Sequence, residues 1–540
     1  MAEGGAPGLE LARAETGQVI ERVPTAVTAF VGRTLKGPPQ RPVAVSSFAE
    51  FQQVFGGLWQ PSTLSYAVEQ YFESGGRRAL VVRVANGARP PTLTLSAGGA
   101  ALRLAGVHPG SREYLRASVD YDGIPEGDGD RFNLVVQRVR SAGSELIEDQ
   151  EIYRRASVRR ESGRFIGDLL LHSRLARAVE PPPAQRPDRS APGPGGSSVG
   201  YACSNPDGDD GGPLTDYDLI GSAAEARGLF ALGEAESFNF LCVPPLTREQ
   251  DVGLGTLLVA ARFCRERHAL LLVDPPASWA SAREALGAVR SWPFRSDSAA
   301  MFFPRVQALD RLRGRLETFA SCGAAAGMLA RSDETSPVWL AAECDEMVMR
   351  PGLRPAAIVS DAERLRLSQA GINTLAAARA APGLQVSART LASGGGACPD
   401  WRYLSARRLS LLVASSVERG TRWMILEHNG PATWARARAL VGAFLEDLTA
   451  RGAFAGACAE DSWFVICDER VNRAETIAEG RVNILFGFAN ARPGEFDAWL
   501  LSHHPAASRM RPVSVNRLAT SRRRVEWEIE TTILQKIASR

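Results

Sequence analysis

Few residues of this chain have the types and spacing that catalysis requires. The pattern G-x-S-x-G, which presents a serine nucleophile on a strand-to-helix turn, occurs at Gly196–Gly200. It falls in a segment rich in proline and glycine, so we interpret it as coincidence. A phosphate-binding loop needs a lysine after G-x-x-x-x-G, and neither Lys36 nor Lys536, the only lysines, has that context. Gly253 and Gly255 lack the third glycine of a dinucleotide-binding turn and fall inside an expected helix.

Metal-binding patterns are missing in the same way. The histidines form no H-E-x-x-H, and the adjacent pair His503 and His504 opens a C-terminal tail where we expect surface positions. The acidic turns at residues 128–130 and 207–210 lack the distal glutamate of a calcium loop. The eight cysteines form no C-x-x-C pair and several lie in apolar runs, which indicates small buried side chains in a reducing compartment. We predict no catalytic, cofactor-binding or metal-binding residues.

Asp274 is the best enzymatic candidate in the chain. It ends an expected parallel strand, where α/β enzymes place catalytic groups. Pro275 and Pro276 follow it directly, which favours a simple strand-ending turn. An α/β enzyme of unknown reaction centred on Asp274 therefore stays open as an alternative to a non-enzymatic protein.

The composition of the chain limits which other classes of protein it can belong to. A chain of 540 residues, with 45% hydrophobic and 23% charged residues, is expected to form three or four globular domains. A net charge of +3 gives no basis for nucleic-acid binding. No apolar run approaches the roughly 20 residues of a membrane span, and the N-terminus lacks the pattern of a secretory signal. We expect synthesis and folding in the cytoplasm, with no membrane insertion.

The first part of the chain alternates strand and helix patterns around a β-rich insertion. Strands are expected within residues 24–33 and at Ala79–Val84, and helices at Phe48–Phe55 and Leu64–Ser74. Short alternating runs such as TLTLSA and FNLVVQRV then predict an inserted β-rich domain. The predicted segments are an N-terminal arm at 1–23, a first part of the core at 24–89, the insertion at 90–180 and a Pro/Gly-rich linker at 181–213.

The second part returns to strand–helix alternation. SFNFLCVPP, HALLLVDPP and AAMFFPRV predict parallel strands, and Thr247 with Gln250 predicts a capping box that opens a helix to about Arg267. A helix near 404–419, the strand WMILE, a helix near 431–451 and the strands SWFVICDE, RVNILFGFA and EFDAWLL follow. We predict a central α/β core at 214–360, a C-terminal α/β domain at 361–502 and an extension at 503–540. The fold class is mixed α/β and multidomain.

Several collinear blocks resemble the tail-sheath family of contractile phage tails, R-type pyocins and extracellular contractile injection systems. They are PTAVTAFVGRTLKGPPQRPVAVSSFAEFQQVFGG, LSYAVEQYFESGGRRALVVRVA, DQEIYRRASV, DGDDGGPLTDYDLIG with FNFLCVPP, and the stretch from WRYLSARRLSLLVASSVERG to GEFDAWLL. The resemblance runs, with gaps, from about Val23 to Leu501. It implies a structural subunit that assembles with copies of itself into a six-start helical tube around an inner tail tube, and contracts to drive that tube through a target envelope.

The resemblance also implies the partners and the interfaces. The partners are further copies of the chain, the inner tube protein, and baseplate and terminator or cap proteins, in a particle assembled in the cytoplasm and released from the cell in some systems. Terminal arms would add strands to the sheets of neighbouring subunits. The candidate residues for such strands are Leu9, Leu11, Phe496, Trp499, Leu500, Val525, Trp527, Ile529 and Ile533.

Both termini depart from the family pattern. The arm usually reads like PGVYVEE, and residues 7–12 here read PGLELA. The chain also continues for about forty residues past EFDAWLL, with a period-2 alternation at Val525–Ile533. We interpret that alternation as an extra intersubunit strand or a docking element for a cap or baseplate. A non-contractile sheath-like or baseplate component is a further alternative.

Overall fold

The computed structural model describes residues 19–192, 200–340, 348–376, 386–392, 399–456 and 458–513. The chain divides into two units. The larger unit comprises Pro24–Ser393 and Arg402–Leu404, and the smaller unit comprises Met1–Val23, Gly394–Trp401 and Ser405–Arg540. No helix in the described residues is long and apolar enough to cross a membrane.

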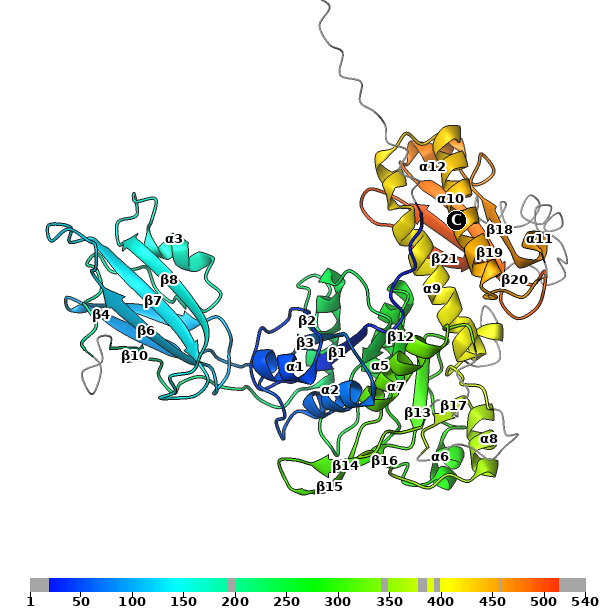
Figure 1. Cartoon of the computed structure of the whole chain (residues 1–540), viewed down its shortest axis with the longest axis horizontal. Helices are drawn as coiled ribbons and strands as arrows, with labels where there is room; N and C mark the ends of the chain where they lie inside the picture. Colours follow the sequence, from blue (N-terminus) through cyan, green and yellow to red (C-terminus); the bar gives the residue numbers. More distant parts are fainter. Residues whose placement is uncertain are drawn as a thin grey trace, which may run out of the picture. The chain divides into compact units, whose positions relative to one another are not determined.

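A seven-stranded sheet forms the centre of the larger unit (Figure 1). In order across the sheet, its strands are β17 (Ile372–Thr374), β13 (Ala299–Phe303), β12 (Leu270–Val273), β11 (Phe240–Cys242), β1 (Thr28–Gly32), β3 (Ala79–Arg83) and β2 (Val43–Val45). Every pairing is parallel except that of β2 with β3. The central strands β11, β12 and β13 are continuous apolar runs rather than alternating ones because helices cover both faces of a parallel sheet. The predicted parallel core is confirmed.

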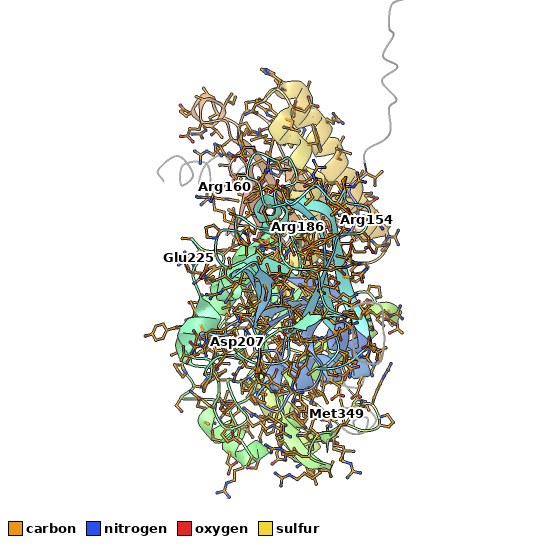
Figure 2. The ribbon with its side chains drawn as sticks, turned by 90° about the vertical axis from the view of Figure 1, so that its left-hand side faces the viewer. Arg154, Arg160, Arg186, Asp207, Glu225 and Met349 are labelled. Atoms are coloured by element: carbon orange, nitrogen blue, oxygen red, sulfur yellow. The ribbon has the colours of Figure 1, made fainter. Side chains whose placement is uncertain are left out.

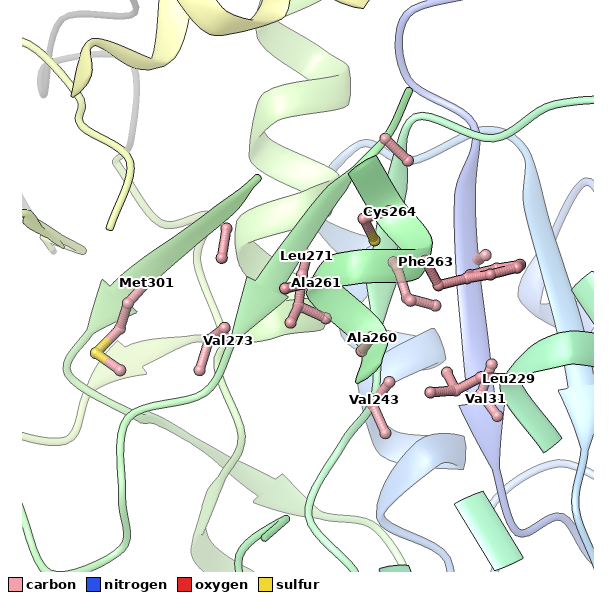
Figure 3. Close-up of a cluster of buried hydrophobic side chains, with 14 of the residues drawn as sticks. Val31, Leu229, Val243, Ala260, Ala261, Phe263, Cys264, Leu271, Val273 and Met301 are labelled. Atoms are coloured by element: carbon pink, nitrogen blue, oxygen red, sulfur yellow. The ribbon is translucent and has the colours of Figure 1, made fainter. Parts of the chain in front are cut away.

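Helices from two parts of the chain cover the sheet. They are α1 (Phe48–Phe55), α2 (Thr63–Ser74), α4 (Asp216–Ile220), η2 (Gly228–Glu234), α5 (Leu254–Glu266), α6 (Ala282–Ala288), α7 (Cys322–Thr335) and α8 (Asp361–Gln369). On one face, Val31 and Leu271 of the strands pack with Leu229 of η2 and Ala260 of α5 (Figure 3). On the other face, Phe30 meets the ring of Tyr71 in α2, with centroids 5.5 Å apart.

A small antiparallel sheet follows β13. Strand β14 (Val306–Asp310) pairs with β15 (Arg315–Phe319) on one side and with β16 (Arg354–Pro355) on the other. The turn between β14 and β15 makes them a hairpin, which Figure 1 shows extending from the larger unit.

The β-rich insertion contains two antiparallel sheets. One has the order β4 (Thr92–Ala97), β5 (Ala100–Gly106), β9 (Ala176–Ala178), and the other has the order β10 (Ala202–Cys203), β6 (Tyr114–Asp120), β7 (Arg131–Val139), β8 (Ile147–Ser157). Helix α3 (Ile166–Leu171) packs beside them through Ile166 and Leu170. The chain enters and leaves the insertion at adjacent points, because Asn86 bridges Gly212 and Arg89 bridges Asp209. The predicted β-rich character is therefore present over a longer stretch than 90–180.

Part of the predicted linker 181–213 belongs to the insertion. Strand β10 lies within it and pairs with β6. Arg186 stacks on the ring of Tyr121 at 3.8 Å, and the Tyr121 hydroxyl donates to the carbonyl of Pro187 at 2.7 Å. Proline and glycine content predicted flexibility here, but these contacts hold the chain against the sheet. Figure 2 labels Arg186 together with Arg154 and Arg160, whose side chains are exposed at the end of β8 and in the loop after it.

The smaller unit combines two long helices with an antiparallel sheet. The elements in chain order are η4 (Pro399–Arg402), α9 (Leu404–Gly420), η5 (Arg422–Leu426), α10 (Pro431–Ala450), α11 (Ala459–Ser462), β18 (Trp463–Ile466), α12 (Ala474–Ala478), β19 (Val482–Ala489), β20 (Phe496–His503) and β21 (Arg509–Val513). The sheet order is β18-β19-β20-β21. The predicted strand WMILE is wrong, because those residues form η5 and leave Leu426 91% exposed. The mixed α/β, multidomain class is confirmed.

The division between the units differs from the predicted boundary at residue 361. Helix α8 packs on the large sheet through Leu367, and β17 pairs with β13 from Met301↔Ile372 to Phe303↔Thr374. Both elements therefore complete the larger unit, and the smaller unit resumes at Gly394.

Candidate functional site

Asp274, the enzymatic candidate, directly follows the carboxyl end of β12 and is partly buried. Its Oδ1 accepts hydrogen bonds from the main-chain N–H groups of Ser321 and Cys322, both at 2.7 Å. Those groups open helix α7, and a helix leaves its first N–H groups without partners inside the helix. Asp274 therefore satisfies the helix terminus from a distant strand, which is a structural role.

The groups around Asp274 are engaged in contacts that hold the start of α7 and the loop after β12. Its Oδ2 has no hydrogen-bond partner among the described residues, although it faces an apolar setting that includes Val273 and Val243. Burial raises the pKa of the carboxyl group, opposed by the N–H groups and by the nearby charge of Arg305. Arg305 is itself occupied, since it pairs with Asp251 and donates to the carbonyl of Pro275 at 3.0 Å. The Ser321 hydroxyl donates to Asp274 Oδ1 at 3.4 Å and to the carbonyl of Phe302 at 2.8 Å, and burial raises the pKa of the neighbouring Cys322 thiol, so neither group is an activated nucleophile.

Replacing Asp274 tests this capping role. We expect Asp274→Ala to lower the free energy of unfolding by about 1–3 kcal/mol relative to Asp274→Asn, because only asparagine keeps an oxygen for the two N–H groups. Burial raises the folded-state pKa of the Asp274 carboxyl group above its usual value of 3.8. The contribution of this group to the free energy of unfolding is therefore fully present below pH 3.8 and declines as the pH rises through the folded-state pKa. The asparagine variant cannot titrate. Urea denaturation at pH 4 and pH 8 should show wild type losing stability relative to Asp274→Asn, and a pH-independent difference would contradict this.

The other motifs have structural positions or lie outside the described residues. Residues 193–199, with most of the G-x-S-x-G pattern, are outside them. Gly255 lies in the first turn of α5, as predicted, but Gly253 is the N-cap and so precedes the helix, which begins later than expected. Among the described residues, no group of three or more His, Cys, Asp or Glu side chains could hold a metal ion.

His503 is a correction to the sequence analysis. It was expected at the surface, but it ends β20 and is 1% exposed. Its ring nitrogens lie 2.8 Å from the Thr421 hydroxyl and 2.7 Å from the Ser508 hydroxyl. Burial lowers the pKa of His503 to about 4, so the ring is neutral at physiological pH. The side chain is a core polar group that joins the helical and sheet layers of the smaller unit.

The sheet of the smaller unit contains the predicted strand residues Phe496, Trp499 and Leu500. They lie on β20, which pairs with β19 on one side and β21 on the other. Main-chain groups of β20 are thus already engaged within this chain. The open edges of the described sheet are β18 and β21, and they are where an incoming strand would pair. The candidates Leu9, Leu11, Val525, Trp527, Ile529 and Ile533 lie outside the described residues.

Both terminal segments connect to the smaller unit. The main-chain N–H of Val23 donates to the Ser416 hydroxyl of α9 at 3.1 Å. Ile20 is 4% exposed and lies against Gly420, where any β-carbon would approach its side chain at 2.7 Å. At the other terminus, β21 occupies the start of the predicted extension and pairs with β20. The arm before Val19 and the segment after Val513 therefore leave from the same unit.

The sequence matches no family model and no curated protein. Solved structures do match. The sheath of an extracellular contractile injection system, the PVC sheath complex in its contracted state, aligns over 92% of this chain and 97% of that chain with a TM-score of 0.52 and 15% identity. The sheath tail protein of Listeria innocua aligns over 90% and 96%, with a TM-score of 0.57 and 12% identity. The contracted helical sheath of the anti-feeding prophage aligns over 92% and 98%, with a TM-score of 0.50 and 16% identity. This chain has the contractile-sheath fold.

Within the sheath fold, the sequence analysis missed two elements at the interface candidates. Strand β21 lies in the predicted C-terminal extension and Ile20–Val23 lies in the predicted N-terminal arm, and the contacts of both within the same chain were not predicted. The signal in β21 is weak, because RMRPV contains Pro512 and is largely exposed. Proline is tolerated in an edge strand, where one face of the backbone needs no partner, so Pro512 is consistent with the position of β21.

Proposed function

We propose that this chain is the structural sheath subunit of a contractile injection system. Copies would assemble into a helical tube around an inner tail tube and contract to drive that tube through a target envelope. The observation that carries the proposal is the match to sheath structures over nine-tenths or more of both chains. A match that spans both units and the insertion supports the whole subunit rather than one common domain.

The described sheet edges supply a physical mechanism for assembly. A strand from a neighbouring copy that paired with β18 or β21 would gain main-chain hydrogen bonds without needing a specific side-chain surface. The 18 residues before Val19 would reach roughly 60 Å if extended. Arms of that length would let subunits rotate and slide while the added strands stay paired, which contraction requires. No bond chemistry is needed, in accord with the capping role of Asp274.

The proposed partners follow from the same role. They are further copies of this chain, an inner tube protein, and baseplate and cap proteins at the two ends of the tube. We place assembly in the cytoplasm and the finished subunit in a phage tail or phage tail-like particle. In this role the chain is not an enzyme.

Negative-stain electron microscopy of the purified protein, alone and co-expressed with the tube protein encoded beside it, tests the proposal. Regular tubes or striated sheaths would support it. Dispersed monomers under both conditions would contradict it, and would return attention to an enzyme centred on Asp274. Short rings or discs that never elongate would instead favour a baseplate component.

Deleting the terminal segments tests the proposed strand exchange. We expect Δ1–18 and Δ514–540 each to abolish tubes, because each removes a segment that we propose pairs with a sheet edge of a neighbour, while β21 and the Val23 contact stay in place. The circular dichroism spectrum and the thermal unfolding temperature of each deletion variant should match those of wild type, since neither deletion removes a helix or strand of the described fold. Tubes of normal length and contraction from either deletion would contradict a role for that segment.

A further inference from the structure

The β14–β15 hairpin carries an apolar tip that the described residues leave uncovered. Leu309 and Leu316 are directly opposite each other on the two strands and are each 56% exposed. Leu312 lies in the turn and is 52% exposed. Burying a leucine side chain is worth roughly 1.5–3 kcal/mol, so three neighbouring exposed leucines form a surface suited to a partner.

The arginines of the tip pair with carboxylates of the larger unit but stay exposed: Arg311 and Arg315 are 61% and 69% exposed, whereas Glu69 and Glu317 are 10% and 12% exposed. Arg311 pairs with Glu69 at 3.2 Å and Glu73 at 2.7 Å in helix α2. Arg313 and Arg315 both pair with Glu317, at 3.0 and 2.7 Å. The three arginines therefore lie along the hairpin and the helix rather than over the leucines. This arrangement leaves an apolar tip with a basic border.

The base of the hairpin is rigid. Arg248 pairs with Asp310 at 2.7 Å and with Glu317, and it stacks on the rings of Tyr66 and Phe319 within 4.9 Å. Asp310 also accepts from the Leu312 N–H at 2.9 Å, which fixes the turn. A tip held in one conformation loses little entropy when it binds.

A complementary receptor is present on the same chain. A cavity of about 100 Å³ opens beside the start of α5 and is lined mainly by apolar side chains, including Val252, Leu257 and Trp292. Its size suits a branched aliphatic side chain. The loop that leads to it carries the exposed carboxylate of Glu249, opposite in charge to the border of the tip, whereas Asp251 is paired with Arg305. Tip and cavity therefore match in chemistry and in charge.

We propose that the leucine tip of one copy inserts into the α5 cavity of a neighbouring copy in the assembled tube. The tip and the cavity are different surfaces, so the contact is head-to-tail and each copy can both donate a tip and receive one. Contacts of this type propagate into rings or helices rather than closing as a dimer. The inference rests on the proposed sheath function, since it names a contact between sheath subunits beyond the terminal strands.

Photo-crosslinking of assembled tubes tests the contact directly. With p-benzoylphenylalanine at position 312, mass spectrometry should find cross-links to peptides from residues 243–293 of another copy. The same probe at Leu171, which is 64% exposed at the end of α3 in the insertion, is the control and should not give those cross-links. Tubes whose cross-links from position 312 go elsewhere, or are absent, would overturn the inference and leave the sheath function standing. No tubes from wild-type protein would overturn the sheath function and the inference with it.

Paired substitutions give an independent readout. We expect Leu312→Asp, at the tip, and Leu257→Trp, which fills the cavity, each to raise by about tenfold or more the protein concentration at which tubes form. If the two residues meet, the double variant should be no worse than the poorer single variant. Additive losses would overturn the contact. Leu312 is exposed, so its variant should unfold at the wild-type temperature, which separates an assembly defect from misfolding.

Discussion

Gly323→Val will prevent the larger unit from folding. Helices α2 and α7 cross at Gly323 and Gly327, where their backbones approach too closely for side chains. A β-carbon on Gly323 would overlap the carbonyl oxygen of Ala67, and one on Gly327 would lie 2.7 Å from the β-carbon of Ser74 and overlap the carbonyl of Tyr71. These obstacles are main-chain atoms, which cannot turn aside as a flexible side chain can.

The smaller substitution Gly323→Ala separates helix propensity from packing. Propensity alone favours alanine over glycine in a helix by about 1 kcal/mol. Overpacking a tight contact costs about 1–3 kcal/mol or more, and here the backbone must shift. We expect net destabilisation of about 2 kcal/mol or more for alanine, and no folded larger unit for valine.

Gly255→Ala is the matched control, because nothing lies within 4 Å of a β-carbon built at Gly255 in α5. It should leave stability unchanged or raise it by up to about 1 kcal/mol. Hydrogen–deuterium exchange read peptide by peptide measures these effects in α7 and β12, with peptides of the smaller unit as the internal reference. Wild-type protection of α7 in Gly323→Val would show that the helices do not meet as described.

Asp497→Ala will destabilise the smaller unit by about 3–5 kcal/mol, the usual cost of removing a buried charged group from its partners. Asp497 lies on β20 and is 7% exposed. Its Oδ2 accepts from the Trp401 indole at 3.0 Å, and from the Ser410 hydroxyl and the Asn490 amide at 3.1 Å each. Alanine would leave all three donors without this acceptor in a buried setting.

The same cluster contains a stacked arrangement that depends on Asp497. The guanidinium of Arg407, 1% exposed, lies 4.0 Å from the ring of Trp401, and Trp401 stacks on Trp499 with centroids 5.4 Å apart. Urea denaturation followed by near-ultraviolet circular dichroism, to which this tryptophan pair contributes, measures the loss. Glu495→Ala is the control, since Glu495 makes a surface pair with Arg492 worth under about 1 kcal/mol. An equal loss of stability in Asp497→Ala and Glu495→Ala would contradict the role assigned to Asp497.

Local patterns predicted the elements whose determinants are local. Helix α1 spans Phe48–Phe55 as expected, because the Ser47 hydroxyl caps its start and Gly56, at a φ of 88°, ends it. Thr247 is a case in which the local sequence pattern predicted the wrong start of a helix. Its hydroxyl accepts from the Gln250 N–H at 3.0 Å, as a capping residue would, yet α5 begins only at Leu254. Asp216, distant in sequence, accepts from the Gly253 N–H at 2.8 Å and fixes the start.

Contacts between residues far apart in the sequence account for the other differences between the predicted and the observed structure. The role of Asp274 depends on Ser321 and Cys322, nearly fifty positions later, so no spacing rule could reveal it. The run WMILE is short, and a short apolar run does not distinguish a strand from a helical turn. The proposed interfaces need neighbouring copies, which one sequence does not contain. The resemblance to the family supplied the fold that motif analysis alone would have missed.

The central position of β1 has a consequence for biosynthesis. Strand β1 pairs with β3, some fifty residues later, but also with β11, whose partner for Thr28 is Phe240. At a synthesis rate of about 5–20 residues per second, one edge of this fully buried strand has no partner for roughly ten to forty seconds, until β11 is synthesised. The insertion is made during that interval. Newly made chains therefore pass through a stage with an open hydrophobic strand, which favours chaperone engagement on the ribosome and delays subunit association until the sheet is complete.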